Sequence, residues 1–254
     1  MLTPARVTSL DMLRDFRAAL AGFRIEGQDA LTAVELDLRR AGDWLAERRQ
    51  FWQRQVRALQ DELTQAKAEL SRRQMVLPGE RPPDCTQQIK ALRKAQQMLE
   101  HAEGQVERCR RWEPALRRAV EEYEGPARQL GGLLDADLPR AVALLERLLT
   151  SLEAYVAVAP TSVPPSPPEG RGERRSAGPR PEPAMTLTTG RTKLLESYKA
   201  LLARWEDTRE GWGDLVGKEF EEKCWEPIGP HVQATLRAID RLAAVIAQMH
   251  HECE

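Results

Sequence analysis

Apolar or small side chains recur every three or four residues through much of the first third of the chain, and no other feature constrains the fold as strongly. Spacing of this kind, held over several heptads, draws a narrow apolar seam along one side of a long helix. The seam positions are Leu31, Val34, Leu38, Ala41, Leu45, Trp52, Val56, Leu59, Leu63, Ala66 and Leu70. Such a helix requires a second helix to cover its seam, because the apolar stripe would otherwise stay in water.

The same spacing returns after VLPGERPPD at residues 76–84, where Pro and Gly interrupt the pattern and Asp84 can cap the next helix. The second seam consists of Ile89, Leu92, Ala95, Leu99, Ala102, Val106, Cys109, Leu116, Val120 and Tyr123. Two long amphipathic helices joined by one turn lie antiparallel, since this buries both seams with the shortest connection. The pattern predicts a long antiparallel coiled-coil hairpin with arms at about residues 28–76 and 84–125.

Two short helices are expected at the base of this hairpin. One begins at a Ser9 cap and ends near Gly22 or Gly27, and the other carries the apolar run that starts at Leu138, after the break EGPARQLGGLLDADLP. Charged residues make up 30% of the chain and aromatic residues only 5%. This composition is typical of long amphipathic helices rather than sheets. We therefore expect an all-α fold in which residues 1–159 form one helical domain.

A proline-rich segment follows this domain. Residues 160–183 read PTSVPPSPPEGRGERRSAGPRPEP and hold eight of the 17 prolines in the chain. A segment with nothing to bury cannot offset its ordering entropy, so residues 160–185 are predicted to be a disordered, flexible linker. The alternative is a polyproline ligand for an aromatic groove, because PPSPP suits that conformation.

Residues 186–254 carry two further apolar helical faces, separated by glycines. Gly211, Gly213 and Asp214 are expected to form the turn between the two helices, because glycines cluster there and nowhere else in this segment. These features predict a separate C-terminal helical hairpin, tied to the first domain only through the linker.

Four large aromatic side chains gather around this turn, namely Trp205, Trp212, Phe220 and Trp225. A lone two-helix hairpin cannot cover large side chains on both of its faces. We therefore expect these four residues to bind a helical partner. The alternative is that they only fill the corner between the helices, where Trp supplies a large apolar area.

The stretch EGWGDLVGKEFEEKCW resembles the WXG-type family of helical hairpins, which are substrates and subunits of type VII secretion systems. In that family a Trp-Xaa-Gly turn joins two antiparallel helices, and an aromatic residue follows the Trp by about two helical turns. Trp212 and Phe220 stand at these positions, while Asp214 stands at the third turn position. The resemblance covers about residues 190–250. It implies a helical protein partner, such as a second copy of this chain or a related hairpin.

Charge and hydropathy exclude several classes of partner. The 38 basic and 39 acidic side chains almost cancel, so no net field favours nucleic acid. No stretch approaches the roughly 20 apolar residues of a membrane span. The chain opens without a secretory signal, and its four cysteines are widely spaced, so we expect a cytoplasmic protein. Export without a cleavable signal peptide is the alternative.

The sequence contains no recognised catalytic or metal-binding motif. The chain has no phosphate-binding Gly loop, no G-x-S-x-G elbow and no H-E-x-x-H helix. The terminal run His250, His251, Glu252 and Cys253 is not expected to hold a metal, because neighbours on a helix point to different faces. We therefore predict no catalytic residue, no cofactor and no metal.

Together these patterns indicate a non-enzymatic helical interaction or scaffold protein whose C-terminal hairpin docks on a helical partner. Two alternatives stay open. One is a secreted substrate or component of a type VII-related system, and the other is a structural subunit of a phage-like assembly.

Overall fold

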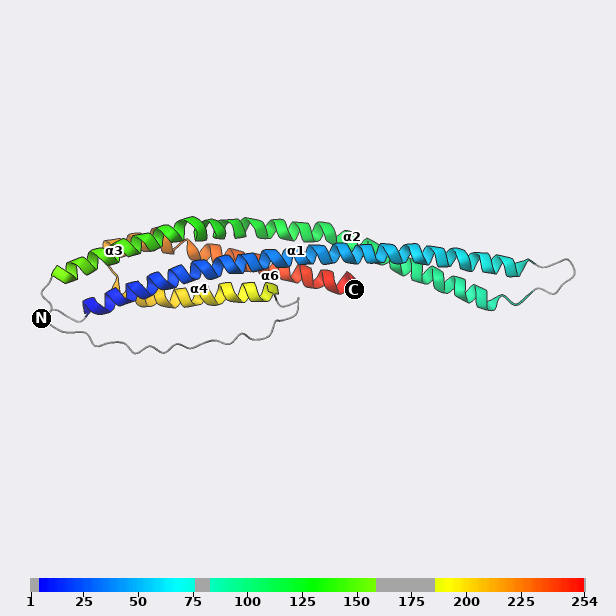
Figure 1. Ribbon diagram of the computed structural model, residues 1–254, viewed down its shortest axis with the longest axis horizontal. Coiled ribbons are helices and arrows are strands. Elements are labelled where there is room, and N and C mark those ends of the chain that lie inside the picture. The colour runs from blue at the N-terminus through cyan, green and yellow to red at the C-terminus, as the bar shows by residue number, and fades with distance from the viewer. Residues whose placement is uncertain (1–4, 76–82, 159–185, 254) are drawn as a thin grey trace. The chain divides into compact units, whose positions relative to one another are not determined.

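The computed structural model describes residues 5–75, 83–158 and 186–253, and throughout these ranges the regular elements are helical (Figure 1). The predicted all-α class is confirmed. The elements are α1 (Ala5–Gln74), α2 (Thr86–Gly132), the π-helical turn η1 (Leu133–Asp137), α3 (Leu138–Val158), α4 (Thr186–Gly211), α5 (Leu215–Phe220), the π-helical turn η3 (Glu221–Trp225) and α6 (Ile228–Cys253). The predicted linker, residues 160–185, and most of the predicted hairpin tip, residues 76–84, lie outside the described residues.

The first arm of the hairpin and the expected N-terminal base helix are one continuous helix of 70 residues, α1. The prediction that a separate helix starts at Ser9 and ends near Gly22 or Gly27 is wrong, because all three residues lie inside α1. Gly27 has a packing role instead. A Cβ atom there would lie 3.0 Å from Cδ1 of Leu134, so the missing side chain leaves room for this buried leucine.

The second arm also extends further than expected. The glycines in EGPARQLGGLLDADLP do not break the helix, since Gly132 adopts helical dihedral angles, with φ −59° and ψ −42°. The chain then passes through η1, in which the backbone N–H of Leu138 donates to the carbonyl of Leu133. A π turn absorbs an extra residue without ending a helix, and here it buries both Leu133 and Leu134.

The chain divides into two compact units whose boundaries differ from the expected domains. One unit combines residues 1–37 with 122–241, and the other combines 38–121 with 242–254. The sequence predicts a separate C-terminal hairpin, but each compact unit contains parts of the C-terminal helices together with parts of α1 and α2. The physical reason is that α4 and α6 cannot bury all of each other's apolar side chains, and α1 packs against those that remain.

In the first unit, α4 and the start of α6 pack on α1 and on the end of α2. Gly190 marks a close approach of α4 to α1, because a Cβ there would lie 3.0 Å from the carbonyl oxygen of Ala30. Further along, the Lys193 ammonium lies 2.8 Å from a carboxylate oxygen of Asp29. The Thr235 hydroxyl, on α6, donates to the carbonyl of Pro126 at 3.2 Å.

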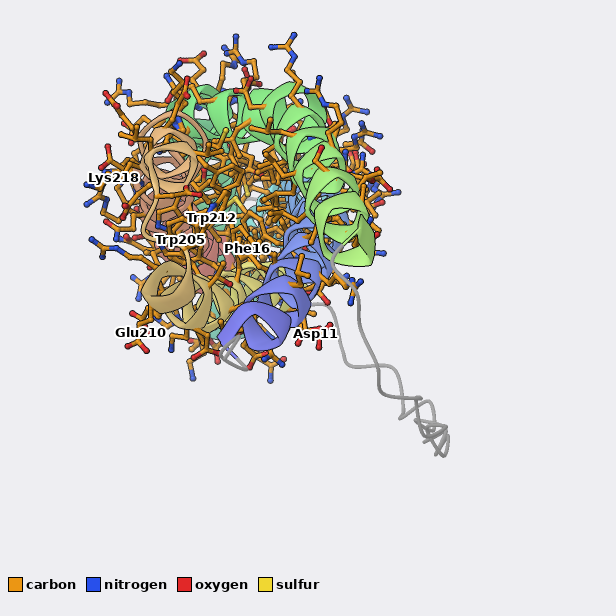
Figure 2. The ribbon with its side chains drawn as sticks, turned by 90° about the vertical axis from the view of Figure 1, so that its left-hand side faces the viewer. Asp11, Phe16, Trp205, Glu210, Trp212 and Lys218 are labelled. Carbon is orange, nitrogen blue, oxygen red and sulfur yellow. The ribbon has the colours of Figure 1, made fainter. Side chains whose placement is uncertain are left out.

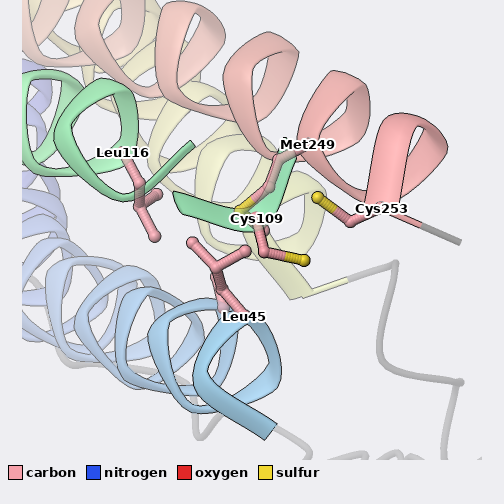
Figure 3. Packing of buried hydrophobic residues seen from close by; sticks show 6 residues of the cluster. Leu45, Cys109, Leu116, Met249 and Cys253 are labelled. Atoms are coloured by element: carbon pink, nitrogen blue, oxygen red, sulfur yellow. The ribbon is translucent and has the colours of Figure 1, made fainter. Parts of the chain in front are cut away.

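In the second unit, the later part of α1 and the first part of α2 form the predicted antiparallel hairpin (Figure 1). The Arg49 guanidinium pairs with Glu113, and the Trp52 and His101 rings lie 5.8 Å apart. The end of α6 packs against both arms of the hairpin. Its buried cluster consists of Ala41, Leu45, Cys109, Leu116, Met249 and Cys253 (Figure 3).

Candidate interaction site at the hairpin corner

The turn between α4 and α5 lies at the residues where the sequence predicts one. Gly211 is the last residue of α4, Trp212 and Gly213 are outside any helix, and Asp214 precedes α5. The Asp214 carboxylate accepts a hydrogen bond from the backbone N–H of Gly217 at 2.7 Å. This contact is an N-cap, which satisfies a backbone donor that the first helical turn leaves free.

Trp212 packs against the start of α5. A Cβ at Gly217 would lie 2.4 Å from the carbonyl oxygen of Trp212 and 3.1 Å from its Cγ atom. Glycine at 217 therefore lets the Trp212 backbone and ring lie directly on α5. The Trp212 ring also contacts Phe220, with their centroids 5.3 Å apart.

The aromatic residues expected to bind a partner converge on Phe16 of α1, which is itself fully buried. The ring centroid of Phe16 lies 5.2 Å from that of Trp205, 5.9 Å from that of Phe220 and 6.0 Å from that of Trp225. Trp205 and Trp225 stack at 4.9 Å. Figure 2 shows Phe16 and Trp205 pointing into the space between the helices, while Asp11, Glu210 and Lys218 point outward.

This packing corrects the expectation for two of the four residues. Trp205 is 4% exposed and Phe220 is 2% exposed, so neither has free surface for a second protein. Both contact the chain's own helix α1. Trp212 and Trp225 are half-buried, and each keeps an accessible edge at the corner.

The apolar side chains that the corner does expose are Leu215 and Val216, which the sequence reasoning missed. Leu215 is 84% exposed and Val216 is 40% exposed. The signal for Leu215 is its helical spacing from the buried Phe220. Gly217 lies three positions before Phe220 on nearly the same face and is also buried, whereas Leu215, five positions before, points to a different face. The same spacing does not predict the 40% exposure of Val216.

Charged side chains surround this apolar pair. The Arg209 guanidinium lies 3.1 Å from a carboxylate oxygen of Glu221, which ties the end of α4 to η3. The Lys223 ammonium pairs with Glu219 at 2.6 Å, and this contact lowers the pKa of Glu219 from its ordinary value. The corner therefore presents a small apolar centre with charges of both signs at its rim.

The described ranges contain neither a metal-binding cluster nor a helix that could span a membrane. Within residues 5–75, 83–158 and 186–253, no three His, Cys, Asp or Glu side chains come together as a metal would need. Nor does any helix in these ranges have the length and apolar character required to cross a membrane. A shallow groove of about 260 Å³ lies between Ala21 and Arg24 of α1 and Pro139, Val142, Ala143 and Glu146 of α3.

Comparison with known proteins adds no relative, because no family model, curated protein or solved structure matches the chain.

Asp214→Ala is expected to lower the free energy of unfolding by about 1 kcal/mol, because the N-cap bond to Gly217 is lost. Chemical denaturation followed by circular dichroism measures this change. Asp214→Asn should retain most of the stability, since an amide oxygen can accept the same bond. Equal losses in the two variants would contradict a capping role.

Proposed function

We propose that this protein is a non-enzymatic helical adaptor that binds another helical protein through the corner between α4 and α5. The observation that carries the proposal is the 84% exposure of Leu215 beside half-exposed Val216, on a turn that the aromatic cluster holds in place. Neighbouring apolar side chains that stay in water inside a polar rim are typical of contact points in protein interfaces.

The mechanism is burial of this small apolar centre against an apolar stripe on the partner. Leu215 would enter a gap between partner side chains, with Val216 and the exposed edge of Trp212 beside it. Lys218 and Glu222 lie on the exposed rim and would set the orientation through charge. Stable interfaces bury about 800 Å² on each partner, so the corner would form the centre of a wider contact.

A double variant of the full chain tests this proposal. Leu215→Ser/Val216→Ser is expected to bind its partner at least about ten times more weakly, because burying a single leucine contributes about 1.5–3 kcal/mol. The tagged proteins would be used to capture partners from cells that make the protein, with quantitative mass spectrometry of what each one retains. The binding constant would then be measured with the recovered partner.

The matched control is Ile25→Ser/Leu152→Ser, which removes two exposed apolar side chains elsewhere in the first unit. Circular dichroism should show the same helix content for all three proteins. Partners retained equally by the wild-type protein and the corner variant would overturn the proposal, as would their equal loss from the control.

A second candidate is a WXG-like component of a type VII-related secretion system. It is supported by the placement of Trp212 between two helices, with its ring 5.3 Å from that of Phe220. Export would distinguish the two candidates. A secreted component should accumulate in culture supernatant only when the secretion machinery is intact, whereas a scaffold should stay with the cells in both cases.

A further inference from the structure

The buried cluster of the second unit contains two thiols from elements far apart in the sequence. Cys109 lies on α2 and Cys253 is the last residue of α6, and both side chains are 0% exposed. Both are free thiols in the structure. Figure 3 shows their sulfur atoms on the same side of the cluster, between Leu45 and the end of α6.

We propose that Cys109 and Cys253 are an oxidation site, at which hydrogen peroxide or an organic peroxide converts the two thiols into an intramolecular disulfide that fastens the last turn of α6 to α2.

The two thiols belong to the same buried cluster. A hydrogen bond joins the side chains of Cys253 and Cys109, and burial together with this bond raises the pKa of Cys253 to about 12. The raised pKa keeps the Cys253 thiol neutral while the end of α6 is in place. Disulfide formation therefore requires the terminal turn of α6 to open, so that a thiolate can form in water.

Specific contacts keep the end of α6 in this place. The Arg48 guanidinium donates to the backbone carbonyl of Cys253 at 2.8 Å, and the Trp112 ring N–H donates to the Glu252 carboxylate at 3.0 Å. The His250 ring stacks on Trp44, with centroids 4.0 Å apart. These contacts bring the turn back to the same position after each opening, with Cys253 again beside Cys109.

The other two cysteines lie in different surroundings. Cys85 precedes α2, and its thiol donates to the carbonyl of Pro83 at 3.5 Å. Cys224 lies in η3 and belongs to the first unit. The structure thus pairs Cys109 with Cys253 and with neither of the others.

The reaction balances with one peroxide for each disulfide. The Cys253 thiolate attacks a peroxide oxygen, breaks the O–O bond and becomes a sulfenic acid, and the leaving oxygen departs as water or an alcohol after taking a proton. The Cys109 sulfur then attacks the sulfenic sulfur, which forms the S–S bond and releases water. The two thiols lose two electrons and two protons in total, and the peroxide is reduced by two electrons.

The test uses full-length Cys85→Ser/Cys224→Ser, which retains only the proposed pair. After treatment with hydrogen peroxide, thiol titration of the unfolded protein should fall from two groups to none, and non-reducing peptide mapping should recover the linkage between Cys109 and Cys253. The thermal midpoint should rise by roughly 5–15 °C, because the crosslink closes a long loop, and dithiothreitol should reverse the shift.

Two controls complete the design. Cys253→Ala in the same background should show no shift in the thermal midpoint and should not form a disulfide within one chain. Wild-type protein should lose two of its four thiols. Oxidation of both cysteines to sulfinic acid without a crosslink would overturn the proposal, and so would a disulfide that includes Cys85 or Cys224 in the wild-type protein.

Discussion

Trp205→Ala is expected to lower the free energy of unfolding by about 3–5 kcal/mol, which is the cost of deleting a fully buried aromatic side chain. Trp205 is 4% exposed and its ring contacts three others, those of Phe16, Phe220 and Trp225. The cavity would open between α1 and α4, beside Phe16, Phe220 and Trp225. Urea denaturation followed by circular dichroism at 222 nm measures the loss.

Trp212→Ala is the matched control, because it removes the same side chain from a half-buried position at the same corner. Its cost should be clearly smaller than that of Trp205→Ala. If Trp205→Ala were the milder of the two, the aromatic cluster around Phe16 would not be the core of the first unit.

Gly217→Ala is expected to cost about 1–3 kcal/mol and to weaken partner binding as well. The added Cβ would lie 2.4 Å from the Trp212 carbonyl oxygen, a contact with backbone that cannot be relieved by turning a side chain. Either Trp212 or the start of α5 must move. Because Leu215 and Val216 follow this turn directly, their positions on the proposed binding surface would change too.

Gly213→Ala separates this steric effect from a general effect of alanine in the turn. A Cβ at 213 would meet no atom within 4 Å, so this variant should be within about 0.5 kcal/mol of the wild-type protein. Denaturation curves that coincide for Gly213→Ala and Gly217→Ala would contradict the close approach of Trp212 to α5.

The helical class, the antiparallel hairpin and the positions of the helix ends at Gly211 and Asp214 could be predicted from the sequence. Each depends on local signals. Three-four spacing assigns a helix and its apolar face, and Pro, Gly and Asp mark where helices end. These signals were strong because the arms of the hairpin repeat them over many turns.

The docking of the C-terminal helices could not be predicted in the same way. Periodicity shows that Trp205 and Phe220 lie on apolar faces, but it does not show which helix covers them. Phe16 of α1 supplies that cover from nearly two hundred residues away in the chain. A second copy of the chain would have satisfied the same pattern.

The continuity of the long helices cannot be predicted from the sequence for a related reason. Gly27 and Gly132 are typical signals of helix ends, yet glycine inside a helix is tolerated where a large side chain packs against it or where the turn widens. Leu134 packs against Gly27, and η1 follows Gly132 directly. Neither circumstance is visible before the packing is known.

Residues 186–241 form one folded unit with the first part of α1, up to residue 37, and with the end of α2. The most direct measurement places a specific protease site within residues 160–185, cuts the purified protein there and follows both fragments by gel filtration with light scattering. The two fragments are expected to elute together as one complex, and Phe16→Ala should make them separate at lower denaturant concentration. Fragments that separate at once on cutting, without denaturant, would show instead that the C-terminal hairpin is a domain of its own.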